Sequence, residues 1–162
     1  MSVEVIVRQL KDRVDILETM YAYCRHADLL DGDGMADLFT PNCIANFVPG
    51  GEDTILRGQA ALRAFLNGAL GVTVSGSHHI SNAELIFETP DRVTLHCYMY
   101  SWQQFTGFPV TSDCHRWGRY ENQFVRTPQG WRMRRLMLLS AGEYGGARIG
   151  EQLGRPFPPV FD

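Results

Sequence analysis

The sequence has few cysteines, and none of them has the spacing of a metal-binding or redox motif. Only four of its 162 residues are cysteines, and no two form a C-x-x-C pair. This absence excludes a zinc knuckle and a thioredoxin-like redox motif. We therefore expect Cys24, Cys43, Cys97 and Cys114 to be ordinary reduced thiols.

Basic clusters and long apolar runs are also missing. The net charge is −3, and no cluster of Lys or Arg is expected on one face of the protein, so no nucleic-acid surface and no polybasic membrane patch is predicted. The N-terminal stretch MSVEVIVRQLKDRVDILETMYAYC carries a charge every few residues, which argues against a signal peptide or a membrane span. The expected location is cytoplasmic, and the expected partner is a small molecule or another protein chain.

Several familiar catalytic motifs are absent as well. The chain has no G-x-S-x-G nucleophile elbow, no G-x-G-x-x-G dinucleotide fingerprint and no phosphate-binding G-x-x-x-x-G-K-[ST] loop. It also has no H-E-x-x-H pattern and no third ligand at a recognisable spacing from its one histidine pair. We expect no metal site.

What is present is a chain long and apolar enough for one domain, with 44% hydrophobic residues. Apolar residues from Val3 to Tyr21 recur at three- and four-residue intervals, which predicts an amphipathic helix, broken or bent near the polar Asp12. QAALRAFLNGAL predicts another helix, and four strand-like runs follow. This order predicts a single α+β domain over residues 1–162, with residues 141–162 as an extended Gly/Pro-rich tail.

The stretch SGSHHISN contains the adjacent histidines His78 and His79. In an extended segment, neighbouring side chains point to opposite sides, so only one of the two can reach a given pocket and the pair is a poor metal site. One ring packed and the other solvated, without any function, is an equally good interpretation from sequence alone. For Asp28, near the end of the first helical region, an ordinary turn or helix-terminal role is the more common one.

The order of several segments changes these interpretations. A helix with Tyr23 and Asp28 is followed by DLFTPNC, GQAALRAFLNG, SHHISN before a strand, and GRYENQFVRTPQGWRM. In this order they resemble the SnoaL-like branch of the nuclear transport factor 2-like superfamily, over nearly the whole chain to about residue 140. The resemblance implies a curved antiparallel sheet that packs against N-terminal helices as a cone and encloses one deep, largely apolar pocket.

The resemblance also implies site residues. Dehydratases and dehydrochlorinases of this branch use an Asp from the first helical region and a His just before the second strand, which match Asp28 and His78 here. The tyrosine five residues before that Asp matches Tyr23. His78 would then be a general base, Asp28 would hold its tautomer, Tyr23 would donate to a substrate oxygen, and no cofactor would be needed.

The remaining pocket walls also follow from the resemblance. The related families point Met99 inward, with Tyr120 and Phe47 as further walls that bind substrate. Many relatives have an arginine five residues after the tryptophan of the G-W strand, but Leu136 occupies that position here. Whether a cation reaches the pocket is therefore open.

The function expected from these features is a cofactor-independent lyase or isomerase, foremost a dehydratase, acting on a hydrophobic polycyclic or aromatic-derived small molecule. Ketosteroid isomerase-like or polyketide cyclase-like carbanion chemistry is the first alternative. A non-catalytic binding module or dioxygenase small-subunit-like domain is the second. Self-association is also expected, as a trimer or else a dimer, because the outer sheet face and the tail residues Phe157 and Phe161 carry aromatic surface.

Overall fold

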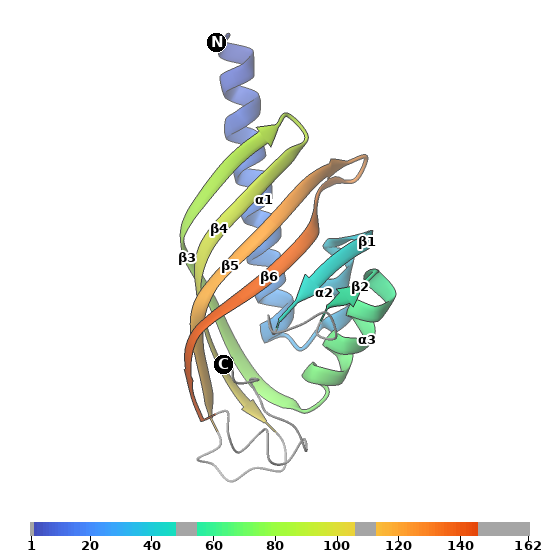
Figure 1. Ribbon diagram of the computed structural model, residues 1–162, viewed down its shortest axis with the longest axis vertical. Coiled ribbons are helices and arrows are strands. Elements are labelled where there is room, and N and C mark those ends of the chain that lie inside the picture. Colours follow the sequence, from blue (N-terminus) through green and yellow to red (C-terminus); the bar gives the residue numbers. More distant parts are fainter. Residues whose placement is uncertain (1, 48–54, 106–112, 146–162) are drawn as a thin grey trace.

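The computed structural model describes residues 2–47, 55–105 and 113–145. The chain begins with helices α1 (Val3–Asp28) and α2 (Gly32–Asp37), strands β1 (Phe39–Asn46) and β2 (Leu56–Arg57), and helix α3 (Gln59–Leu70). Four long strands follow: β3 (Thr73–Thr89), β4 (Arg92–Phe105), β5 (Cys114–Thr127) and β6 (Gly130–Tyr144) (Figure 1). The expected α+β class is confirmed.

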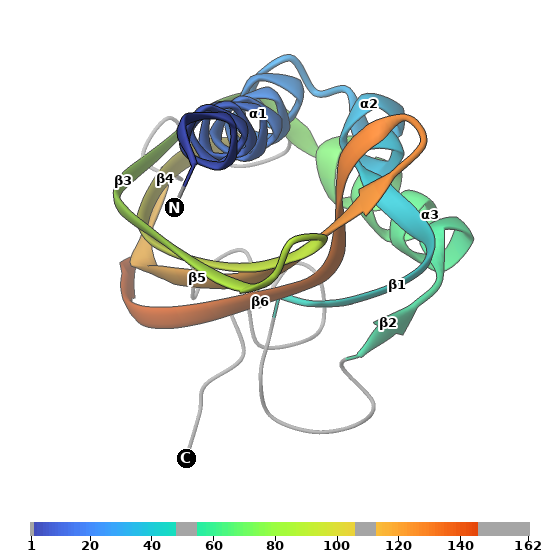
Figure 2. The same cartoon turned by 90° about the horizontal axis from the view of Figure 1, so that it is seen from above.

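The strands form one curved sheet in the order β2-β1-β6-β5-β4-β3. Neighbouring strands are antiparallel except β1 and β6, which are parallel. Figure 2 shows that the sheet curves around one side of the molecule and that α1 and the two shorter helices lie on its concave side. The curved sheet and the helices therefore enclose the core, as expected for a cone-shaped fold.

Two segments differ from the expected boundaries. SGSHHISN does not precede a strand but lies within β3, where a bulge between Ser81 and Glu84 and the left-handed Asn82 (φ 53°) bend the strand. Residues 141–144 of the expected tail belong to β6, and residues 146–162 lie outside the described residues. Within the described ranges, no helix is both long enough and apolar enough to cross a membrane.

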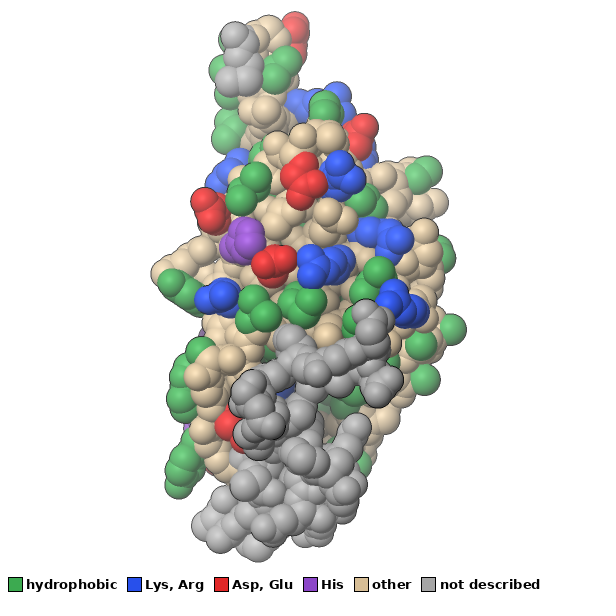
Figure 3. All heavy atoms as spheres, viewed as in Figure 1, with side chains coloured by type: hydrophobic (Ala, Val, Ile, Leu, Met, Phe, Trp, Pro, Cys, Tyr) green, Lys and Arg blue, Asp and Glu red, His purple; other side chains and the backbone are tan. Residues whose placement is uncertain are grey.

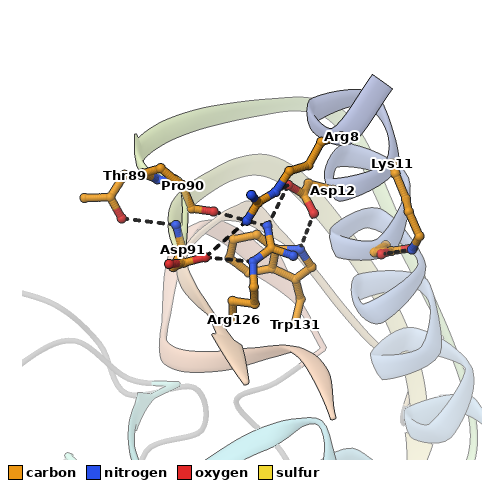
Figure 4. Close-up of polar contacts among 9 residues, drawn as sticks. Arg8, Lys11, Asp12, Thr89, Pro90, Asp91, Arg126 and Trp131 are labelled. Carbon is orange, nitrogen blue, oxygen red and sulfur yellow. Dashed lines mark hydrogen bonds and ion pairs between the residues drawn. The ribbon is translucent and has the colours of Figure 1, made fainter. Parts of the chain in front are cut away.

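Helix α1 is continuous from Val3 to Asp28, so the break expected near Asp12 is wrong. Its N-terminus is capped by Ser2, whose side chain accepts a hydrogen bond from the backbone N–H of Val5. Asp12 faces the protein interior, where its carboxylate accepts hydrogen bonds from Arg126 (2.7 Å) and from the indole N–H of Trp131 (3.1 Å) (Figure 4). A buried acid with two such donors is compatible with an uninterrupted helix.

Asp12, Asp91, Arg126 and Trp131 form a cluster that attaches α1 to one end of the sheet. Arg126 also donates to Asp91 at 2.8 Å, and its guanidinium lies 4.5 Å from the centre of the Trp131 ring. Burial alone would raise the pKa of Asp12, but the hydrogen bonds from Arg126 and Trp131 outweigh that effect and hold the pKa below its usual value. The ionised form of Asp12 is therefore the one that stabilises the fold.

Asp12→Ala is expected to lower the free energy of unfolding by about 3 kcal/mol, since it leaves the Trp131 N–H and the partly buried Arg126 without their acceptor. Because the pKa is lower in the folded state, the contribution is present above the ordinary carboxyl pKa and is lost as the pH falls below about 4. Urea unfolding at neutral and acid pH measures both effects. Asp15→Ala, at an exposed ion pair with Lys11, should change stability by less than about 1 kcal/mol. Equal losses for the two variants would contradict this account.

Candidate functional site

Asp28 and His78 meet although they are 50 residues apart in sequence, with Asp28 Oδ1 2.7 Å from His78 Nδ1. Asp28 is the last residue of α1, and His78 lies in β3 on the strand face that looks toward the helices. The His78 side chain is 14% exposed and that of Asp28 is 33% exposed. His79 is exposed and interacts with Ser77 (2.9 Å), so it points away from this contact, as expected for the second residue of the pair.

The position of Asp28 is unusual for an acid. A helix C-terminus carries partial negative charge, which favours basic residues such as Arg25 and His26 in the last turn and disfavours a carboxylate. The chain leaves the helix through Leu30, which has a left-handed backbone (φ 58°). An ordinary helix-terminal role therefore explains Asp28 poorly, whereas the contact with His78 explains it well.

A pocket of about 110 Å³ lies between the helices and the sheet, next to His78. With Nδ1 bonded to Asp28, the nitrogen of His78 that remains for a ligand is Nε2. Most of the pocket wall is apolar and comes from α1, α2, α3 and the inner face of the sheet. Its apolar residues include Ala27, Met35, Phe65, Leu66, Leu70 and Leu138.

All of the expected substrate-binding residues line this pocket. Met99 is buried and faces inward, while its neighbour Tyr98 is exposed on the outer side of β4. Phe47 forms a wall together with Phe65, and the two rings stack at 5.1 Å. Tyr120 is buried on β5. The face of β4 that carries Met99 therefore points into the pocket, as expected.

Tyr23 also lines the pocket and packs edge-on against Tyr120, with the ring centres 6.2 Å apart. Burial, and then the neighbouring Tyr120 and Cys24, raises the pKa of Tyr23 well above its usual value. Burial likewise raises the pKa of Tyr120. Both phenols therefore keep their protons near neutral pH and can donate hydrogen bonds.

Arg116, Ser101 and Gln103 also line the pocket, and none of them was expected there from the sequence. Ser101 lies directly opposite His78, and Arg116 lies directly opposite Ser101, on successive strands. The alternation of side chains along β5 could have identified Arg116 as a pocket residue, because residues 116 and 120 lie on the same strand face and Tyr120 was expected in the pocket. The position that carries arginine in many relatives is Leu136, which is fully buried, so the cation at this pocket comes from a different strand.

The cysteines are buried thiols. Burial raises the pKa of Cys24 to about 12, with a further contribution from Asp28, and raises the pKa of Cys97 to about 11. A thiol with so high a pKa is a poor nucleophile. Within the part of the chain that the structure describes, no three His, Cys, Asp or Glu side chains lie close enough together to hold a metal ion.

Comparisons with known proteins give a family and a fold. The sequence pattern of the SnoaL-like domain matches residues 8–137. A candidate scytalone dehydratase from Novosphingobium aromaticivorans has a similar structure (TM-score 0.79, 21% identity, 86% of this chain and 91% of that one). A hexachlorocyclohexane dehydrochlorinase is also similar (TM-score 0.74, 14% identity, 85% and 90%). So is a nuclear transport factor 2-like protein from N. aromaticivorans (TM-score 0.63, 23% identity, 86% and 90%). No curated protein matches the chain in sequence.

Proposed function

The chain belongs to the SnoaL-like domain family, and from that premise we propose that it is a cofactor-independent lyase that dehydrates a hydrophobic, polycyclic or aromatic-derived small molecule. The observation that carries the proposal is the 2.7 Å contact between Asp28 and His78 at the wall of an apolar pocket. Similar structures include proteins named as a dehydratase and a dehydrochlorinase, and both names denote eliminations.

In the proposed reaction His78 Nε2 removes a proton from a substrate carbon. The electron pair of that C–H bond forms the new C=C bond, and the adjacent C–O bond breaks with its pair on oxygen. The leaving hydroxyl takes the proton from the imidazolium and departs as water. Asp28 stabilises the imidazolium and holds the tautomer, and the Tyr23 hydroxyl donates to the substrate oxygen on which negative charge develops.

The alternative of isomerisation or cyclisation uses the same base and differs only in where the proton or carbanion goes. A binding module is less well supported. Such a module gains nothing from an imidazole at the pocket wall that is bonded to a carboxylate, because the partial burial of these two groups costs free energy. Phe47, Met99 and Tyr120 would hold the apolar body of the substrate in either enzyme.

The proposal is tested by incubating the protein with scytalone, with hexachlorocyclohexane and with a panel of hydroxylated polycyclic compounds, both with and without EDTA. Loss of water from scytalone or from at least one hydroxylated compound, at a rate unchanged by EDTA, is the expected result. Loss of HCl from hexachlorocyclohexane alone would indicate elimination of a different leaving group. Isomerised product without loss of water would favour the alternative chemistry. Absence of turnover together with tight binding would favour the binding module.

Tyr23→Phe is expected to lower kcat by about 10²–10³-fold at most, because one hydrogen-bond donor to the developing charge is lost while the ring packing is kept. KM should change little, since the donor acts mainly in the transition state. Steady-state kinetics on the substrate found above measures both constants. Tyr21→Phe, on the exposed side of α1, is the matched control and should retain full activity. A Tyr23→Phe enzyme with unchanged kcat would remove Tyr23 from the mechanism.

We also propose that the chain self-associates. Val3, Val7, Leu10, Val14, Leu17 and Tyr21 repeat at intervals of four and three residues along α1, the spacing of a coiled-coil seam. Val7, Leu10 and Val14 are each 58% exposed. The first turns of α1 project beyond the sheet, and Figure 3 shows hydrophobic side chains exposed there.

The same view shows charged side chains of both signs across the middle of the outer sheet face, so that face is less uniformly apolar than expected. Phe157 and Phe161 lie outside the described residues.

Light scattering is expected to give a mass of two or three times 18.3 kDa at micromolar concentration, with the trimer favoured. The double substitution Leu10→Glu and Val14→Glu should shift the mass toward that of one chain, because it places charges in the apolar seam. Tyr98→Glu on the outer sheet face should leave the mass unchanged if α1 is the interface. A single-chain mass for the wild type would refute self-association.

A further inference from the structure

A row of polar side chains crosses the concave face of the sheet. His78 of β3 pairs with Ser101 of β4, Ser101 pairs with Arg116 of β5, and Arg116 pairs with Glu143 of β6. Residues directly opposite one another on neighbouring strands point to the same face. The first three of these residues line the pocket.

Arg116 brings a positive charge to a wall that is otherwise almost uncharged. Among the described residues that line the pocket, it is the sole Arg or Lys, and none is Asp or Glu. Its Nε atom is buried. Burial lowers the pKa of Arg116, and the neighbouring Cys114 and Glu143 oppose that effect, but an arginine remains protonated near neutral pH.

Glu143 lies beside Arg116 and has one buried carboxylate oxygen. Burial raises the pKa of Glu143, and the charge of Arg116 opposes that rise. Arg116 lines the pocket and Glu143 does not. Of these two charged residues, a ligand in the pocket therefore meets the cation Arg116. A planar guanidinium with several N–H donors suits a carboxylate, which it can bind through two parallel hydrogen bonds.

His78 and Arg116 lie two strands apart in this row, with Ser101 between them. Their strands are separated by β4, and neighbouring strands are about 4.8 Å apart, so their backbones lie about 10 Å from each other. A carbonyl oxygen next to the carbon that His78 deprotonates would be only two bonds away from that carbon. This separation of the backbones is compatible with a ligand group at Arg116 that is distinct from the carbon that His78 deprotonates.

We propose that Arg116 binds a carboxylate of the substrate, so that the pocket selects hydrophobic carboxylic acids and places the carbon to be deprotonated at His78. The orientation toward His78 rests on the proposed function. The binding of a carboxylate by Arg116 does not, and it can be measured without turnover.

The probes are 2-naphthoate and 2-naphthalenemethanol, which share a ring system and differ in charge. Calorimetry at pH 7.5 should show that the wild type binds 2-naphthoate at least about tenfold more tightly, the value of one charge-assisted hydrogen bond. Arg116→Gln should abolish this preference and leave the affinity for the alcohol unchanged. Arg116→Lys should retain part of the preference, because it keeps the charge but not the planar fork.

Two further variants separate this role from a purely structural one. Glu143→Gln should increase the affinity for 2-naphthoate, because it removes the negative charge beside Arg116. Arg135→Gln removes an arginine paired with Glu121 outside the pocket and should leave both affinities unchanged. The proposal is overturned if the wild type does not prefer 2-naphthoate, if Arg116→Gln weakens both probes equally, or if Glu143→Gln lowers the affinity for 2-naphthoate. A failure of the proposed lyase activity would leave all three binding results unaffected.

Discussion

Replacing His78 by alanine is expected to lower turnover by about 10⁴-fold, the upper end of what a positioned general base contributes. The loss should be this large because the imidazole both removes the proton and returns it to the leaving hydroxyl. His78 is the one histidine among the described residues that line the pocket, and its Nδ1 is bonded to Asp28. Steady-state kinetics on the substrate identified by screening measures the effect.

His79→Ala is the matched control, since it removes the same side chain one residue away. His79 is exposed on the opposite face of β3 and lies next to Tyr100, with the ring centres 6.1 Å apart. Its loss should change turnover by less than about tenfold. If His79→Ala abolished turnover and His78→Ala did not, the proposed dyad would have to be abandoned.

Asp28→Asn should be nearly as damaging, with a loss of up to about 10⁴-fold in kcat, the effect of the corresponding substitution in the Ser-His-Asp triad. The amide keeps the shape of the side chain but removes the charge that stabilises the imidazolium, and it can favour the wrong tautomer of His78. Because the hydrogen-bonded geometry can survive, KM should change much less than kcat.

Asp37→Asn is the control for Asp28. Asp37 is an exposed acid that ends α2 and pairs with Arg63, so its substitution alters surface charge by the same amount without touching the pocket. Its activity should remain close to that of the wild type. Equal losses in the two variants would indicate that surface charge, not the dyad, governs the rate.

Local periodicity was enough to predict several parts of the fold. The Ala/Leu spacing of QAALRAFLNGAL predicts a helix, and α3 covers those residues. The alternation of β4 separates inward Met99 from outward Tyr98, and the adjacency of His78 and His79 sends the two rings to opposite faces. Each of these features depends on residues within one element, so it is visible in a single stretch of sequence.

Features that depend on distant partners were not predictable in this way. The polar Asp12 suggested a broken or bent helix, because nothing near it in the sequence could pair with a buried carboxylate. Its partners Arg126 and Trp131 lie more than a hundred residues later in the chain. Alternation with Tyr120 places Arg116 on the inward face of β5, but its position beside Ser101 and two strands from His78 depends on the register of three strands. Sequence alone does not determine that register.

The measurement that tests the central claim most directly is the dependence of the single-turnover rate on pH, compared between the wild type, His78→Ala and His79→Ala. If the Asp28–His78 pair acts as the base, the wild-type rate rises with pH, because only an unprotonated base can accept a proton from the substrate. The account predicts that His79→Ala retains this rise and that the residual rate of His78→Ala no longer shows it. A rise that persists in His78→Ala, or that disappears in His79→Ala, would contradict the assignment of His78 as the base.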